Sequence, residues 1–347
     1  MHPARSGDPG GDGRGGRDRG IDALRALAIG GVVLGHWLVT AWERVPRLVI
    51  SSPLAYQPHL VAASWVLQTL SVFFLVGGYV AARPRTTAST RTGNRLVHLV
   101  RPTAPLLAVW ALVAGVLALN GVPYREIRAL ALPALGPLWF LAVFGALAAL
   151  TPVLKRLPLR LTIISLILLV AVVDTARFAL GAPAWIGSLN LSAWAVPYLL
   201  GMLWARNGLT RRHGIWLLTG GAAATIVLVT WFGYPAAMVG VTGVKVSNLN
   251  PPTLAALTFG LAQTGLALLL HRPLSRVTSS IVTTVNKHAM PIFLWHQTVL
   301  ATAVTVFSLY GRPDSPAWIA QRLTLIAAIL VFMTWCRHQL DGRPARL

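Results

Sequence analysis

One apolar run near the start of the chain carries three ionisable side chains and has the sequence Asp22-Ala23-Leu24-Arg25-Ala26-Leu27-Ala28-Ile29-Gly30-Gly31-Val32-Val33-Leu34-Gly35-His36. An α-helix turns by ~100° per residue, so eleven steps bring His36 to within roughly 20° of Arg25, and Asp22 lies on the same side. A charged residue at mid-bilayer costs about 2.5–3.5 kcal/mol, and such residues usually face a bundle interior and serve a function. We therefore expect a membrane helix with one ionisable stripe, which is a candidate active site.

The composition indicates an integral membrane protein. Of the 347 residues, 55% are hydrophobic and only 11% are charged, whereas soluble domains have about 25% charged residues. The mean hydropathy is +0.64. The apolar runs are long enough for helices that cross a ~30 Å hydrocarbon core, whereas barrel strands would be ~10-residue alternating segments. We predict an all-α, polytopic bundle of membrane helices.

We expect about ten transmembrane helices in a single membrane domain, residues 21–340. The segment 1–20 is rich in Gly, Arg and Asp and cannot bury enough apolar surface to fold, so we expect a disordered cytoplasmic tail. It is not a signal peptide, because the apolar run that follows is long enough to span the bilayer. Residues 341–347 form a short cytoplasmic tail. The predicted spans are 21–41, 64–82, 99–119, 137–154, 161–180, 192–206, 214–233, 253–271, 288–308 and 318–338.

The charges between the apolar runs predict the orientation. Short cytoplasmic loops carry an excess of Lys and Arg. With the N-terminus inside, 21 of the 30 Lys and Arg residues lie on the inner side and eight on the outer side, while Arg25 lies within the first helix. We expect both termini in the cytoplasm and a multi-pass protein of the cell membrane. The net charge of +21 does not indicate nucleic-acid binding, because the cations are scattered along the chain.

The stripe suits proton transfer. Histidine has a pKa near neutrality, so a neutral His36 can take a proton from a hydroxyl group, whereas Arg25 stays protonated and holds anions. About 16 Å of helix separates the two, which puts Arg25 toward the cytoplasm and His36 in the outer half. Alternatively, His36 only hydrogen-bonds a neighbouring helix, while Asp22 and Arg25 form an interfacial ion pair.

Four motifs occur in order along the chain. They are Arg25-x10-His36 preceded by Asp22, then Phe73-Phe74-Leu75-Val76-Gly77-Gly78-Tyr79, Pro137-Leu138-Trp139-Phe140-Leu141 and Pro291-Ile292-Phe293-Leu294-Trp295-His296. Together they resemble membrane-bound acyltransferase family 3, the integral-membrane O-acyltransferases that modify sugars, envelope polymers and antibiotics. The Arg-x10-His spacing is that family's hallmark, although Gly77 replaces its usual serine. Each motif also has a purely structural explanation. The glycines let helices pack closely, Trp139 lies in an interfacial aromatic belt, and His296 is hydrogen-bonded inside the bundle.

The resemblance implies transfer of an acetyl or other short acyl group from an acyl-CoA to a hydroxyl of a sugar, envelope polymer or secondary metabolite. His36 would be the general base, and Arg25, near Asp22, would orient His36 or hold the donor. A covalent acyl-histidine is a second route. Trp139, His296 and Tyr79 are the expected substrate-binding residues. The donor acyl-CoA is a substrate, and no permanently bound cofactor is implied.

A basic cluster follows the second predicted helix. Where the family usually has an Arg-x-x-Arg pair before a proline, this chain has Arg95 and His98, with Arg101 next to Pro102. These residues are candidates for binding the phosphates of coenzyme A, since arginine binds phosphate well. Ordinary positive-inside charge is an equally good explanation.

Metal chemistry and disulfides are not expected. Of nine carboxylates only Asp22 and Asp174 fall in predicted spans, so no cluster with metal-ligand spacing exists. Asp174 and Arg177, three residues apart, are expected to form a local ion pair. The single cysteine, Cys336, excludes an intrachain disulfide.

Two other function classes remain as alternatives. A transporter or flippase also uses intramembrane His and Arg, but transporters often show repeats and paired broken helices, and we find no repeat. A non-catalytic membrane scaffold that keeps the fold is a weaker alternative.

Overall fold

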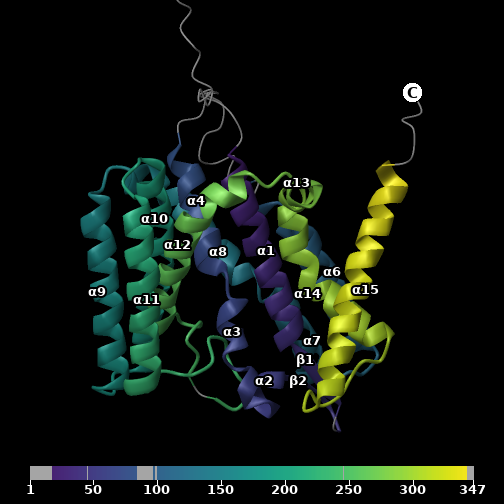
Figure 1. Ribbon diagram of the computed structural model, residues 1–347. Coiled ribbons are helices and arrows are strands. Elements are labelled where there is room, and N and C mark those ends of the chain that lie inside the picture. The colour runs from purple at the N-terminus through teal and green to yellow at the C-terminus, as the bar shows by residue number, and fades with distance from the viewer. Residues whose placement is uncertain (1–17, 45, 84–96, 98–99, 245, 342–347) are drawn as a thin grey trace, which may run out of the picture.

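The structure is a computed structural model that describes residues 18–44, 46–83, 97, 100–244 and 246–341, with side chains through Val331. Helices dominate it, and the long ones run side by side across the molecule (Figure 1). A small antiparallel hairpin, β1 (Ala41–Arg44) and β2 (Leu48–Ser51), follows the first helix. The helices are α1 (Arg19–Val39), α2 (Pro53–Tyr56), η1 (Pro58–Leu60), α3 (Ala63–Val66), α4 (Leu70–Ala82), α6 (Thr103–Leu119), α7 (Tyr124–Leu135), α8 (Leu138–Leu154), α9 (Leu159–Phe178), η2 (Ala184–Trp194), α10 (Ala195–Ala205), α11 (Arg211–Trp231), α12 (Leu254–Ser275), α13 (Ser280–Lys287), α14 (Ala289–Val306) and α15 (Pro316–Asp341).

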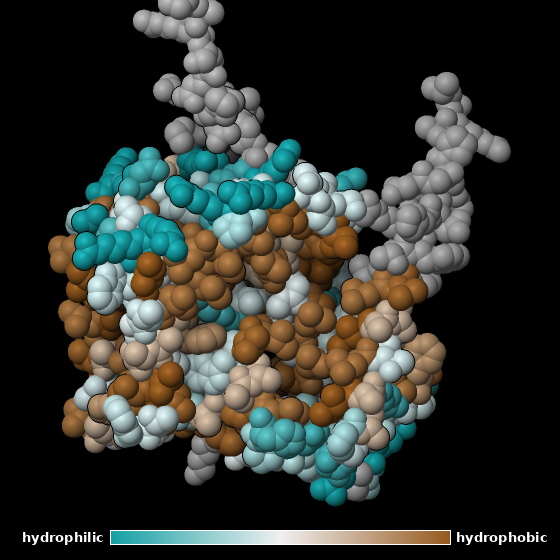
Figure 2. All heavy atoms as spheres, viewed as in Figure 1, coloured by the Kyte–Doolittle hydropathy of each residue, from teal (hydrophilic) through white to brown (hydrophobic). Residues whose placement is uncertain are grey.

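This architecture confirms the all-α polytopic bundle. Eight helical stretches in the described residues are long and apolar enough to cross a membrane. The two other predicted spans, 99–119 and 318–338, overlap the shorter apolar helices Thr103–Leu119 and Pro316–Val331. On the face seen in Figure 2, hydrophobic side chains form a belt between hydrophilic ends, and α1 begins on the side of the bundle where α15 ends (Figure 1). The predicted tails lie almost wholly outside the described residues, as does the Cys336 side chain.

Helix α1 lies in the middle of the bundle and contains the whole ionisable stripe. Asp18 caps its first turn, because the Asp18 carboxylate accepts a hydrogen bond from the backbone N–H of Ile21 at 3.1 Å. Helices α4 and α12 pack on one side of α1, and α13, α14 and α15 pack on the other (Figure 1). The uninterrupted helix confirms that Asp22, Arg25 and His36 share one element.

The single helix expected over 64–82 is instead two helices, α3 and α4, separated at Gln68. The Gln68 side chain accepts a hydrogen bond from the Leu70 N–H at 2.8 Å, and the Thr69 hydroxyl donates to the Ala28 carbonyl of α1 at 2.7 Å. Gly31 of α1 permits this approach, since a Cβ there would lie 2.6 Å from the Thr69 side chain. The continuous helix was wrong because the Gln68 side chain takes the Leu70 N–H in place of a helical carbonyl, while the Thr69 hydroxyl bonds the break to α1.

The motif glycine of α4 brings two helices together. A Cβ on Gly78 would collide with the backbone carbonyl of Tyr198 in α10, and a Cβ on Gly201 of α10 would collide with the carbonyl of Leu75. Small residues let membrane helices approach closely. The short sixth span, 192–206, begins in the 3₁₀ helix η2 and continues as α10.

The expected ion pair between Asp174 and Arg177 does not form. The buried Asp174 carboxylate accepts hydrogen bonds from Asn190 Nδ2 at 2.7 Å, the Tyr234 hydroxyl at 3.0 Å and the Leu254 N–H at 2.7 Å. Burial and the nearby carboxylate raise the pKa of Tyr234. Three tertiary donors therefore take the place of the i,i+3 partner, and they join α9 to η2, to the loop after α11 and to α12.

Candidate active site

His36 of α1 and His296 of α14 form a hydrogen-bonded pair. Nδ1 of His36 lies 3.0 Å from Nε2 of His296, and the rings stack with centroids 5.1 Å apart. Nδ1 of His296 lies 2.7 Å from the carbonyl oxygen of Phe293. A carbonyl oxygen only accepts, so this nitrogen of His296 donates, and Nε2 of a neutral His296 then offers only a lone pair. For two neutral rings, His36 must donate from Nδ1, which leaves its own Nε2 unprotonated.

The backbone around the pair is fixed by further hydrogen bonds between α1 and α14. The Trp37 indole N–H donates to the His296 carbonyl at 2.9 Å, and Gln297 Nε2 donates to the Thr40 hydroxyl at 3.3 Å. Trp37, His296 and Gln297 are all buried. The position of the His36 ring is therefore set by the packing of two helices that are more than 250 residues apart in the chain.

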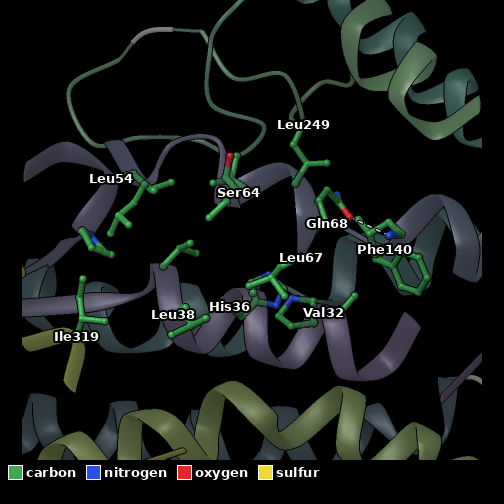
Figure 3. Close-up of a pocket in the computed structure, with 18 of the residues that line it drawn as sticks. Val32, His36, Leu38, Leu54, Ser64, Leu67, Gln68, Phe140, Leu249 and Ile319 are labelled. Atoms are coloured by element: carbon green, nitrogen blue, oxygen red, sulfur yellow. Dashed lines mark hydrogen bonds between the residues drawn. The ribbon is translucent and has the colours of Figure 1, made fainter. Parts of the chain in front are cut away.

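His36 lines a cavity of about 260 Å³ (Figure 3). The cavity lies at the end of α1 that leads into the β hairpin, and its wall also includes parts of the segment 53–70, of α8, α14 and α15 and of the loop after α11. The His36 ring hydrogen-bonds to His296, and the backbone carbonyl of Val32, one turn earlier in α1, is a second hydrogen-bond partner. Nε2 is the ring nitrogen of His36 that does not bond to His296, and in the neutral tautomer deduced above it carries a lone pair that can accept a proton.

The predicted substrate-binding residues fall in three different places. Trp139 lines the cavity, together with Phe140 and Phe293. His296 contacts His36 but is not part of the cavity wall. Tyr79 lies away from the cavity, and its hydroxyl donates to Asp18 Oδ2 at 3.0 Å. The structure therefore brings two of the three predicted residues to His36.

Asp22 and Arg25 lie at the other end of α1. Arg25 Nη1 is 3.7 Å from Asp22 Oδ1 and 3.5 Å from Asn286 Oδ1. Asn286 of α13 also donates to the Asp22 carbonyl at 2.8 Å. Along the helix axis, Arg25 is about 16 Å from His36, and it does not line the cavity. The three residues of the stripe therefore lie along one helix but do not form a single site.

Asp18 organises a second group of polar side chains at this end of α1. Its carboxylate lies 2.9 Å from His271 Nε2 and 3.6 Å from Arg83 Nη2, in addition to the Tyr79 hydroxyl. Burial raises the pKa of Asp18, but hydrogen bonds from His271 and the Ile21 N–H outweigh this, so the pKa lies below its usual range. We call Asp18, Asp22, Arg25, Tyr79, Arg83, His271 and Asn286 the polar end of α1.

The predicted coenzyme A cluster is described only in part. Arg101 is exposed, two residues before α6 begins. Arg95 and His98 lie outside the described residues.

A protein-family model described as an acyltransferase domain matches residues 18–337, from the N-cap of α1 into α15. The chain belongs to acyltransferase family 3. The resemblance carried by the four motifs is thereby confirmed, and the chain is a membrane acyltransferase. No match was found among curated proteins or among solved structures.

Several residues around the polar end of α1 and the cavity of this family 3 acyltransferase were not predicted from the sequence. Asn286 belongs to no motif, and its helix α13 lies between the predicted spans 253–271 and 288–308, where a loop is expected. Gln68 and Thr69 are polar residues in an apolar run, and they signal the break between α3 and α4. Gln68, at this break, lines the cavity. Trp318, Ile319 and Leu323 of α15 line the cavity through tertiary packing, which no motif or periodicity predicts.

Proposed function

We propose that this acyltransferase moves an acetyl or other short acyl group from an acyl-CoA to a hydroxyl group of an acceptor, with His36 as the general base. One observation carries the proposal. His36 lines the cavity and donates from Nδ1 to His296, so its unprotonated Nε2 is free to receive the proton of a hydroxyl group.

The chemistry is a direct transfer. Nε2 of His36 removes the hydroxyl proton as the oxygen attacks the thioester carbonyl carbon, which gives a tetrahedral intermediate. The carbon–sulfur bond then breaks, and the coenzyme A thiolate takes the proton back from His36. General base catalysis of this kind typically contributes about 10²–10⁴-fold. His296 accepts the Nδ1 hydrogen bond throughout and is a positioning residue in this scheme, in place of the substrate-binding role expected from its motif.

The direction of transfer follows from the charge distribution. With ten crossings and both termini in the cytoplasm, the polar end of α1 faces the cytoplasm and the cavity lies in the outer half of the bilayer. The donor then arrives at the polar end. Arg25 lies too far from His36 to orient it, so donor binding is its role here, with Arg95, His98 and Arg101 as further phosphate ligands. Family membership favours acyl transfer over transport.

The test is acyl transfer by the purified full chain in lipid nanodiscs with radiolabelled acetyl-CoA. We expect His36→Ala to lower kcat by about 10²–10⁴-fold and added imidazole to restore part of it. His59→Ala is the matched control, because His59 is an exposed histidine of η1 on the same side of the bundle. Transfer that survives in His36→Ala at the wild-type rate would refute the general base.

A further inference from the structure

The cavity beside His36 differs from a sugar-binding site. We propose that the acceptor presents its hydroxyl group on an apolar body, as an aliphatic or alicyclic alcohol does, and that it comes from the outer half of the bilayer. This proposal rests on the function proposed above, and it departs from the sugar and the envelope polymer among the acceptors that the family resemblance implied.

The chemistry of the wall is the first support. The side chains that surround His36 are almost all apolar. Apart from His36 and the indoles of Trp139 and Trp318, the polar ones are Ser64, whose hydroxyl group bonds to the protein, and Gln68, whose amide oxygen does. The Ser64 hydroxyl donates to the Val61 carbonyl at 2.6 Å and accepts the Met238 N–H at 2.9 Å. The Gln68 side-chain oxygen accepts the Leu70 N–H, as Figure 3 shows. A sugar placed here would leave several hydroxyl groups without partners, which is costly in a buried site.

The size of the cavity is the second support. An engineered apolar cavity of about 150 Å³ holds benzene, so about 260 Å³ accommodates a body much larger than an acetyl group. Trp139, Phe140 and Phe293 give the wall flat aromatic surfaces, and Val32, Leu54 and Leu67 give it aliphatic ones. Burial of an apolar body against such surfaces is favourable in proportion to the area removed from water.

The surroundings of the cavity are the third support. Ala63 of α3 and Leu323 of α15 line the cavity and are also exposed, so they mark its mouth. Val66, one turn after Ala63, is 73% exposed. Figure 2 shows a hollow on this face in the region of α3, bordered mainly by hydrophobic side chains. An acceptor dissolved in the bilayer therefore reaches the mouth without crossing a polar surface.

The first experiment compares acceptor alcohols of different polarity. The full chain in nanodiscs receives acetyl-CoA and either 1-decanol, menthol or methyl β-D-glucopyranoside, and the esters are measured by mass spectrometry. We expect kcat/KM for the two apolar alcohols to exceed that for the glucoside at least tenfold. Equal or faster acylation of the glucoside would overturn the proposal but leave His36-dependent acyl transfer intact.

A second donor tests the other possible occupant, the acyl chain of the donor itself. If octanoyl-CoA is preferred over acetyl-CoA and the three acceptors react equally, the cavity holds the acyl chain and the proposal is wrong. Absence of any His36-dependent release of coenzyme A would instead refute the proposed function.

A variant at the mouth tests the position of the acceptor. Ala63→Trp narrows the entrance, and we expect kcat/KM for 1-decanol to fall at least tenfold. Val66→Trp is the matched control, since it adds the same side chain to the same short helix at a residue that does not line the cavity. Thermal melting of both variants establishes that each is folded. An unchanged kcat/KM for 1-decanol in folded Ala63→Trp would contradict the proposal.

Discussion

The two ends of α1 differ in how they hold ionisable groups. At the polar end, each charged side chain has polar partners: Arg25 contacts Asp22 and Asn286, and Asp18 contacts His271 and Tyr79. At the other end, His36 and His296 pair with each other against an apolar cavity. A charge is costly away from water unless it is paired, whereas a neutral imidazole is not. The comparison teaches that one helix holds paired charges at one end and a pair of imidazoles beside an apolar cavity at the other. In the proposed function, the first end binds the anionic donor and the second carries out proton transfer.

The largest effect is expected from breaking the histidine pair. His296→Leu removes the acceptor for the Nδ1 hydrogen of His36, so the ring is free to take the tautomer in which Nε2 carries the proton. We expect kcat to fall by about 10²-fold with an unchanged KM for the acceptor, measured with 1-decanol and acetyl-CoA. His296→Gln should recover most of the rate, because an amide oxygen accepts the same hydrogen bond.

The glutamine variant separates positioning from a general structural role. If His296 only filled space between α1 and α14, leucine and glutamine would lower kcat to the same extent. Equal kcat values in the two variants would therefore contradict the assigned tautomer.

A smaller effect is expected at the polar end. Arg25→Gln should raise the KM for acetyl-CoA by about tenfold, the usual consequence of losing a hydrogen bond to a charged group, while kcat changes little. The control is Arg47→Gln, because Arg47 is an exposed arginine at the opposite end of the bundle. A loss of kcat with an unchanged KM would place Arg25 in the chemical step and remove the separation between the two ends.

The sequence predicted the parts of the site that lie on one helix. Helical periodicity was enough to place Asp22, Arg25 and His36 on one side of α1, because that argument needs only local geometry. It did not predict that His296 contacts His36, since the two residues are 260 positions apart and meet through the packing of α1 on α14. The motif pointed to His296 as a binding residue, whereas the positioning role that we propose for it rests on its hydrogen bonds to Phe293 and His36.

The errors arose where a polar side chain in an apolar segment formed hydrogen bonds other than the expected ones. Asp174 has an arginine at i+3, yet Asn190, Tyr234 and the Leu254 N–H occupy its oxygens. Gln68 lies in an apolar run that favours a continuous helix, yet its side chain bonds to the backbone and ends that helix. In both places a polar side chain among apolar neighbours was the available signal, and its partner was not predictable from the sequence.

The smallest effect concerns the stability of the polar end. Asp18→Asn keeps a good N-cap residue but removes the carboxylate that faces His271, Tyr79 and Arg83. The native pKa of Asp18 is lowered, so its carboxylate stabilises the fold above the unfolded-state pKa, and this contribution is lost as the pH falls through the native pKa. We expect the Tm of Asp18→Asn to lie a few degrees below wild type at pH 7, and the gap to narrow below about pH 4.

The control for this comparison is Asp314→Asn, because Asp314 forms an exposed ion pair with Arg312 at 3.7 Å, and exposed pairs contribute little to stability. Its Tm should match wild type throughout. If the gap for Asp18→Asn has the same size at pH 7 and pH 3, the charge of Asp18 does not stabilise the fold. The difference would then come from capping or packing, and the charges at this end of α1 would contribute to donor binding alone.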